Sequence, residues 1–378
     1  AEAWSRQGLI SIVANGATDT TFTNFNVNSN INTRNFNLGR LLGAETGLGG
    51  LTAHLNLQAK QTEAIPLSAQ VRGTIDGLQY KEETIKYVQL EGFYNSQRMG
   101  ATVNADWRIG KIFAQANMTQ AKVPDIDFRV RIDTLSIDPF YKNENWKNPQ
   151  LTMAMNGNLK GLDIDNITGT VVIDSLDFHD DNFMIKPGKI ALQAGKNDDN
   201  IKYINFASSY LTANIAGQYM FTTIGDEFTN LMHTYLPNIF QQTKRIRTDQ
   251  NNFTFSISAQ NTGELARAFP LPVDIMQPAT VNGLVNTIDK KITVDGNIPY
   301  VKYGDIDIRN TTIHIANQDS AFDITARTGL LIDKGSHMKY KWIISLVSSQ
   351  VKLFEDNLFI TSLINCTKEM TSPKEINI

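Results

Sequence analysis

The stretch DFRVRIDTL, residues 127–135, alternates between apolar and charged side chains. Its apolar residues share one phase: Phe128, Val130 and Ile132. Its charged residues share the other: Asp127, Arg129, Arg131 and Asp133. Successive side chains of a β-strand point to opposite faces of the sheet. The stretch therefore predicts a strand with one apolar and one charged face. The apolar face either packs in the core of a sandwich or lines a wall that holds an apolar ligand.

The same period of two recurs along most of the chain. It appears in residues 25–31, 51–59, 101–109, 204–209, 211–217, 253–259 and 305–315. Clusters of Gly, Asn and Asp, which are typical of turns, occur at Asp76-Gly77, 155–158 and 196–200. Strands at this spacing predict an antiparallel meander.

One longer helix interrupts the strands, at residues 222–240. Four apolar residues follow its helical period: Ile224, Phe228, Leu231 and Tyr235. The expected end signals are a cap at Thr222 or Thr223, Asp226 and Glu227 in the first turn, and Pro237 at the end. A shorter helical turn is expected at 38–43.

Two segments share an internal plan, residues 71–95 and 155–178. Each contains two glycines four residues apart, Gly73 with Gly77 and Gly157 with Gly161, and then a second apolar strand. This weak repetition of a strand–turn–strand unit favours an elongated array over a closed sandwich.

The sequence changes character near its C-terminal end. In residues 335–378 the alternating runs separated by Asn and Gly no longer occur. The change begins at GSHM, residues 335–338, which matches a common expression-vector scar. We therefore divide the chain into an elongated β region at 1–334 and a separate tail at 335–378.

Composition excludes several functional classes. The formal net charge of −3 and the 19% of charged residues leave no basic surface for nucleic acid or for anionic lipid headgroups. A single cysteine, Cys366, excludes a disulfide framework within the chain. No run of 18 apolar residues predicts a spanning helix. The first residue is not Met, which indicates a mature fragment or an excised piece of a longer protein.

The polar motifs predict surface structure rather than chemistry. HDD at 179–181 reads as a solvated hairpin turn. Three Asp-x-Asp pairs are expected on an outer, wet strand face: Asp125 with Asp127, Asp163 with Asp165, and Asp305 with Asp307. The sequence has no phosphate-binding loop and no nucleophile elbow. We therefore expect no catalytic residue, no metal site and no cofactor, and a protein that is not an enzyme.

Four stretches in this order resemble the AsmA-like superfamily, in particular the TamB (translocation and assembly module) family of Bacteroidetes, over residues 8–334. They are FNLGRLLG at 36–43, GTIDGLQYKEETIKYVQLEGFY at 73–94, DIDNITGTVVIDSLDF at 163–178, and ASSYLTANIAGQYMFTTIGDEFTNLMHTYLP at 207–237. The last is the most specific, a strand ending in Gly217-Gln218-Tyr219 followed by an amphipathic helix that closes on Tyr235–Pro237.

The resemblance implies an all-β fold, an elongated, twisted, mostly antiparallel sheet folded into an open apolar trough. It implies a periplasmic protein of a Gram-negative bacterium, held in the inner membrane by an anchor outside this chain and partnered by an Omp85-type outer-membrane barrel. Its implied function is to conduct phospholipid between the two membranes and so to support outer-membrane biogenesis. Residues in the cleanest alternating runs are then expected to line the groove for acyl chains: Leu55, Leu57, Ile126, Phe128, Val130, Ile132, Phe253, Phe255 and Ile257.

Two other functions compete with the conduit. One is an assembly factor whose exposed edge strands brace a barrel protein. The other is an extracellular β-solenoid, either an adhesin or a carbohydrate-active enzyme. Such an enzyme should cluster carboxylates or aromatic residues on neighbouring strands, whereas this sequence spreads its charges evenly.

Overall fold

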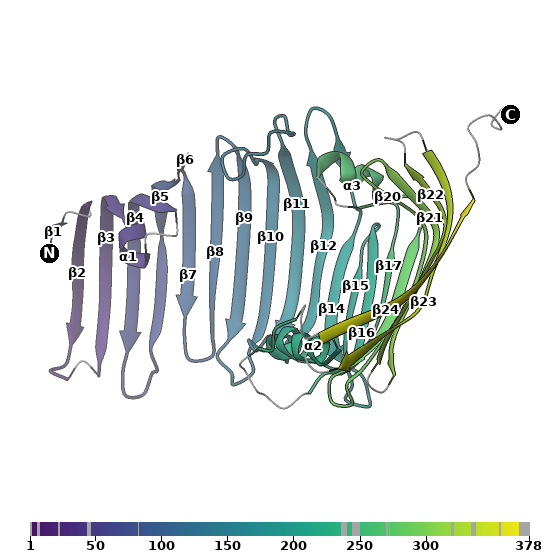
Figure 1. The fold of residues 1–378 in the computed structure, drawn as a ribbon. Helices are drawn as coiled ribbons and strands as arrows, with labels where there is room; N and C mark the ends of the chain where they lie inside the picture. Colours follow the sequence, from purple (N-terminus) through teal and green to yellow (C-terminus); the bar gives the residue numbers. More distant parts are fainter. Residues whose placement is uncertain are drawn as a thin grey trace. The chain divides into compact units, whose positions relative to one another are not determined.

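The structure is a computed structural model, drawn as a ribbon in Figure 1. It describes residues 2–5, 8–21, 23–43, 47–81, 83–235, 240–243, 250–269, 271, 273–318, 321–333, 338–354 and 357–369. Unit 1 comprises residues 1–162 and 169–189, and unit 2 comprises residues 163–168 and 190–378.

Unit 1 is an antiparallel meander. Its strands are β1 (Glu2–Ser5), β2 (Gly8–Thr18), β3 (Phe25–Asn37), β4 (Leu48–Gln61), β5 (Ser68–Tyr80), β6 (Glu83–Ile85), β7 (Val88–Tyr94), β8 (Arg98–Trp107), β9 (Gly110–Thr119), β10 (Asp125–Ser136), β11 (Gln150–Lys160), β12 (Thr168–His179) and β13 (Met184–Ile185), with helix α1 (Leu38–Leu42) after β3. From β1 to β11 each strand pairs with the next, except that β5 pairs with both the short β6 and β7.

Unit 2 continues the same kind of pairing. Its strands are β14 (Ile190–Lys196), β15 (Lys202–Ala207), β16 (Leu211–Gln218), β17 (Asn252–Ala259), β18 (Asp274–Ile275), β19 (Ala279–Asn286), β20 (Lys291–Tyr303), β21 (Ile306–Gln318), β22 (Ala321–Asp333), β23 (Met338–Phe354) and β24 (Asn357–Glu369). Helix α2 (Phe221–Tyr235) precedes β17, and α3 (Gly263–Ala268) follows it. Strand structure therefore continues beyond residue 335, and β23 pairs with β22. Residues 334–337, which hold most of GSHM, lie outside the described residues.

These observations confirm the predicted fold class. Strands make up 64% and helices 8% of the structure, and the antiparallel sheet is open rather than closed into a barrel. Every alternating run contains a strand, although Arg108 and Ile109 at the end of the run 101–109 lie in the turn after β8. Helix α2 is the longest helix of the described residues. None of the described helices is long and apolar enough to cross a membrane.

Two of the three predicted turns are wrong. Asp76-Gly77 lies within β5, where Thr52 pairs with Gly77 and Ala53 with Ile75, so Asp76 is the extra residue of a bulge. Residues 155–158 lie within β11. Only 196–200 forms a turn, closed by the bond from the Asn200 N–H to the Asn197 carbonyl. A glycine next to Asn or Asp is compatible with both a turn and a bulge, and only strand pairing decides between them.

Helix α2 differs from its prediction at its start. It begins at Phe221, so Thr222 and Thr223 lie inside it and the first turn holds no acidic residue. The carboxylate of Asp165, distant in the sequence, accepts bonds from the Thr222 N–H (3.1 Å) and Oγ1 (2.5 Å). A tertiary contact therefore serves as the N-terminal cap. Pro237 lies outside the described residues.

The buried stripe of α2 also differs. Phe228 is 40% exposed, whereas Glu227 is only 4% exposed and faces the sheet beside Leu231. The Glu227 Oε2 accepts bonds from the Thr287 Oγ1 (2.6 Å) and the Gln250 N–H (3.0 Å). Hydrogen bonding thus compensates for burying a carboxylate at this position. The short helix at 38–43 is confirmed as α1, and α3 was not predicted.

Glu227→Gln should lower the free energy of unfolding at neutral pH by about 1–3 kcal/mol, because the donors then bond to a neutral amide oxygen instead of a charged carboxylate oxygen. Burial raises the pKa of Glu227, but the bonds from Thr287, Gln250 and Asn251 hold that pKa below its ordinary value. The carboxylate therefore stabilises the fold above its unfolded-state pKa, and this contribution disappears as the pH falls through the folded-state pKa. Urea unfolding should show a difference between wild type and variant at pH 7 that shrinks in acid. An equal difference at both pH values would contradict this role, and Asp226→Asn is the control.

Candidate apolar groove

Strand register gathers the apolar residues of unit 1 on one face of its sheet. Paired residues point their side chains to the same side. One continuous row therefore crosses β3, β4, β5, β7, β8, β9, β10 and β11: Ile31, Leu55, Gly73, Leu90, Val103, Ala114, Val130 and Met155. The apolar face extends across eight strands, and each strand contributes only a few of its residues.

A hollow lies in this face where three neighbouring strands carry only small residues. Gly92, Ala101 and Ala116 are in register on β7, β8 and β9. Larger side chains surround them: Leu57, Val71, Tyr94, Met99, Met118 and Ile126. The resulting cavity has a volume of about 540 Å³, within the roughly 300–1,000 Å³ of small-molecule sites. Ala101 and Ala116 are exposed, so the floor of the hollow is open to solvent.

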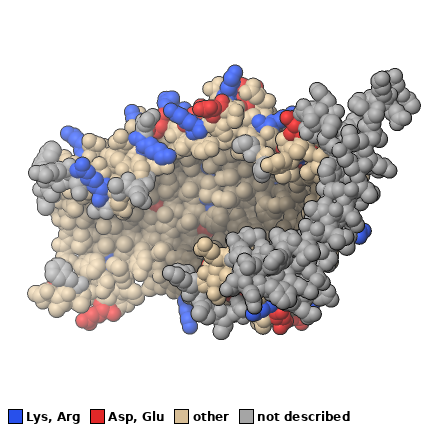
Figure 2. Space-filling model, in the orientation of Figure 1, with Lys and Arg blue, Asp and Glu red and all other residues tan. Residues whose placement is uncertain are grey.

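Charged side chains lie outside the hollow. In Figure 2 the face of unit 1 toward the viewer is almost free of Lys, Arg, Asp and Glu, which gather along its rims. The opposite face of the sheet is polar: the Asn158 amide donates to Asp127 (2.6 Å), and the Asn156 amide donates to Asp174 (2.6 Å). The apolar and charged faces predicted from residues 127–135 are both present.

Phe128 lies on the same apolar face, in register with this floor, because its partner on β9 is Ala116. Its partner on β11 is Gly157, where an added Cβ would clash with the Phe128 ring. A glycine within a strand often marks such a close approach. In unit 2, Phe255 on β17 pairs with Gly283 on β19, and its ring likewise occupies the place of an added Cβ at the glycine.

The nine predicted groove residues have different surroundings. Leu57 and Ile126 line the cavity. Leu55, Phe128 and Val130 share its face, as register shows. Ile132 instead belongs to a buried cluster with Trp107, Ile109 and Leu135.

In unit 2, Phe255 and Ile257 of β17 pair with Ile215 and Ala213 of β16, so the four side chains lie on one apolar face. Phe253 is buried in a cluster with Tyr219 and Val285, against which Ile224 of α2 packs.

Sequence reasoning missed the residues that give the hollow its shape. Tyr94, Met99 and Met118 form much of its wall, and Gly92, Ala101 and Ala116 form its floor. Met99 is in phase with Val103 of the same strand, and this was a usable signal that Met99 lies on the apolar face. The floor had no such signal, because small residues form a hollow only when they are neighbours across strands.

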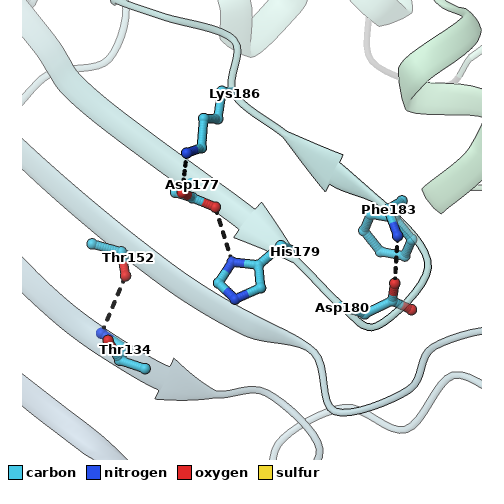
Figure 3. Close-up of polar contacts among 7 residues, drawn as sticks. All are labelled: Thr134, Thr152, Asp177, His179, Asp180, Phe183 and Lys186. Carbon is cyan, nitrogen blue, oxygen red and sulfur yellow. Dashed lines mark hydrogen bonds and ion pairs between the residues drawn. The ribbon is translucent and has the colours of Figure 1, made fainter.

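The HDD segment forms the predicted hairpin turn between β12 and β13 (Figure 3). The prediction that this turn is solvated is wrong for Asp180, which is buried. The Asp180 carboxylate accepts bonds from the Phe183 N–H (2.8 Å) and the Lys147 N–H (3.0 Å). Burial raises the pKa of Asp180, but backbone donors hold it below its ordinary value. Asp177 pairs with His179 (2.9 Å) and Lys186 (2.9 Å), while the Thr134 N–H donates to Thr152 Oγ1 (3.2 Å). These contacts fasten strand ends, and the described residues contain no group of three metal-ligating side chains.

Only one Asp-x-Asp pair has the predicted setting. Asp125 and Asp127 are exposed on β10. Asp165 is buried and caps α2, as described above. Asp307 is 3% exposed and accepts a bond from the Tyr300 hydroxyl (3.0 Å) beside Arg309 (3.5 Å). The prediction of a wet face is therefore wrong for Asp165, whose partner Thr222 is distant in the sequence. It is also wrong for Asp307, whose partners Tyr300 and Arg309 lie on β20 and β21 of the same hairpin.

Comparison with known proteins adds no relative: no protein-family model, curated protein or solved structure matches this chain.

Proposed function

We propose that the chain is a lipid-binding segment of a TamB-like protein that conducts phospholipid between the inner and outer membranes of a Gram-negative bacterium. In this proposal the protein acts in the periplasm without catalysing a reaction. It is anchored in the inner membrane by a part outside this chain and works with an Omp85-type barrel. The observation that carries the proposal is the solvent-open apolar hollow in unit 1, together with the ordered resemblance of the sequence to that family.

An exposed apolar face of this extent needs a physical reason. Large exposed apolar surfaces are unfavourable in water and commonly mark sites that bind lipid or protein. Each CH₂ group of an acyl chain moved from water onto such a face contributes roughly 0.8 kcal/mol. A headgroup can remain at the charged rim while the acyl chain lies on the hollow floor.

Ala116→Leu tests whether the hollow holds the acyl chain. The new side chain fills the floor between Met118 and Ala101, and overfilling a packed apolar site typically costs about 1–3 kcal/mol. Each 1.4 kcal/mol corresponds to about a tenfold change in affinity. We expect a fluorescent fatty acid to bind the variant about tenfold or more weakly in titration.

The matched control is Gln115→Leu, the same new side chain one residue earlier on the opposite face of β9. Its affinity for the fatty acid should equal that of the wild type. Equal binding by the two folded variants and the wild type would reject the hollow as the lipid site. Mass spectrometry of lipid that co-purifies with each protein gives a second readout.

A further inference from the structure

Helix α2 packs on the apolar face of unit 2 and covers part of it. Leu231 and Met232 pack with Ile292, and Val294 and Ile315 contact the same cluster. Nearer its start, Ile224 packs against the cluster of Phe253 and Val285 described above. Strand residues that register places on the apolar face are therefore occupied by side chains of the same chain.

Polar contacts add to this apolar packing in holding α2 in place. Asp165 caps its first turn, and Glu227 binds Thr287 and the backbone before β17, as described above. The other carboxylate oxygen, Glu227 Oε1, is buried and has no hydrogen-bond partner among the described residues. On the outward side, Phe221 and Phe228 are 41% and 40% exposed. The unpaired Oε1 offsets part of the stabilisation that the bonds to Oε2 give the docked helix.

We propose that α2 is an internal lid on unit 2, whose apolar side chains occupy the surface that an acyl chain takes when the helix lifts. The inference rests on the proposed lipid-binding function and adds regulation to it. Unit 1 offers its hollow permanently, whereas the residues of unit 2 that α2 covers, Ile292 and Phe253 among them, become accessible only after the lid is displaced.

The mechanism is a competition between two occupants of one surface. A ligand shifts an equilibrium only through its different affinity for the two states. An acyl chain cannot contact Ile292 and Phe253 while Leu231 and Ile224 cover them, so it binds the open state alone. A 15-residue helix is only marginally stable in water without tertiary contacts. Displacement should therefore also loosen the helix, which makes it visible to hydrogen exchange.

Hydrogen exchange measured by mass spectrometry tests the lid in the unmodified protein. With saturating oleate, the amides of residues 221–235 should exchange at least tenfold faster than in its absence. Val294 is only partly buried, so a photo-crosslinking residue can replace it. This residue should crosslink to α2 in the absence of oleate and to oleate in its presence. Unchanged exchange in α2 together with undiminished crosslinking to α2 would overturn the lid.

Two serine variants on the helix separate a lid from a permanent cap. Met232→Ser weakens the buried side of α2 and should increase oleate capture at position 294 several-fold. Phe228→Ser removes an exposed aromatic side chain from the same helix and should leave capture unchanged. Equal capture by Met232→Ser and wild type would overturn the proposal.

A crosslinker at Phe128 in unit 1 distinguishes this proposal from the function on which it rests. Capture of oleate at 128 with no response of α2 leaves lipid binding standing and rejects the lid. A response of α2 to oleate without capture at 128 supports the lid and rejects the hollow of unit 1 as the lipid site.

Discussion

Phe128→Asp should reduce the passage of phospholipid along unit 1 about a hundredfold. The substitution places a carboxylate on the apolar face, between Gly157 and Ala116. A carboxylate among acyl chains costs roughly 3 kcal/mol, and each 1.4 kcal/mol corresponds to about a tenfold change in an equilibrium. Water reaches an open face, so folding should suffer less than it would in a closed core. The measurement is outer-membrane integrity in cells that depend on the protein, at matched protein levels.

Two further variants make this result interpretable. Asp127→Ala changes the neighbouring residue on the polar face and should preserve integrity. Phe128 packs over Gly157, so its loss also removes an aromatic contact. Ala101→Asp introduces the same charge on the exposed floor without that loss, and it should impair transport as strongly. Full integrity with both aspartate variants, each shown to be folded, would reject the conduit and favour a scaffold that braces a barrel protein.

Trp107→Ala should lower the free energy of unfolding of unit 1 by about 3–5 kcal/mol, the usual cost of truncating a buried aromatic residue. Trp107 is 8% exposed at the end of β8 and packs edge-on against Phe140, with ring centroids 5.7 Å apart. Ile132 and Leu135 complete the cluster. The truncation leaves a cavity that the pleated strands cannot close.

Urea unfolding followed by circular dichroism measures this effect, with Arg108→Ala as the control. The Arg108 side chain is 77% exposed and pairs with Glu83 at 3.5 Å, and surface pairs of this kind contribute about 0–1 kcal/mol. A loss below about 1 kcal/mol for Trp107→Ala would show that this cluster is not the core of unit 1. Binding of a fatty acid to the folded variant should persist, because the hollow is lined by other residues.

The alternation of apolar and polar residues determined much of this protein by itself. It predicted the strands, because side-chain direction in a strand follows directly from position in the sequence. It predicted the apolar and polar faces for the same reason. Residues 221–235 were recognisable as a helix, since their apolar residues recur at helical spacing.

Only the tertiary structure decided which apolar residues are open and which are buried. Three apolar residues with similar surroundings in the sequence have different places in the structure. Leu57 lines the cavity, Ile132 belongs to a core cluster, and Phe253 belongs to a cluster that α2 covers. The hollow arises because Gly92, Ala101 and Ala116 meet across three strands. Asp165 and Glu227 are buried because partners from distant segments compensate for their charge. Alternation along one strand carries no information about its neighbours, whereas register, bulges and helix docking depend on contacts between segments far apart in the chain.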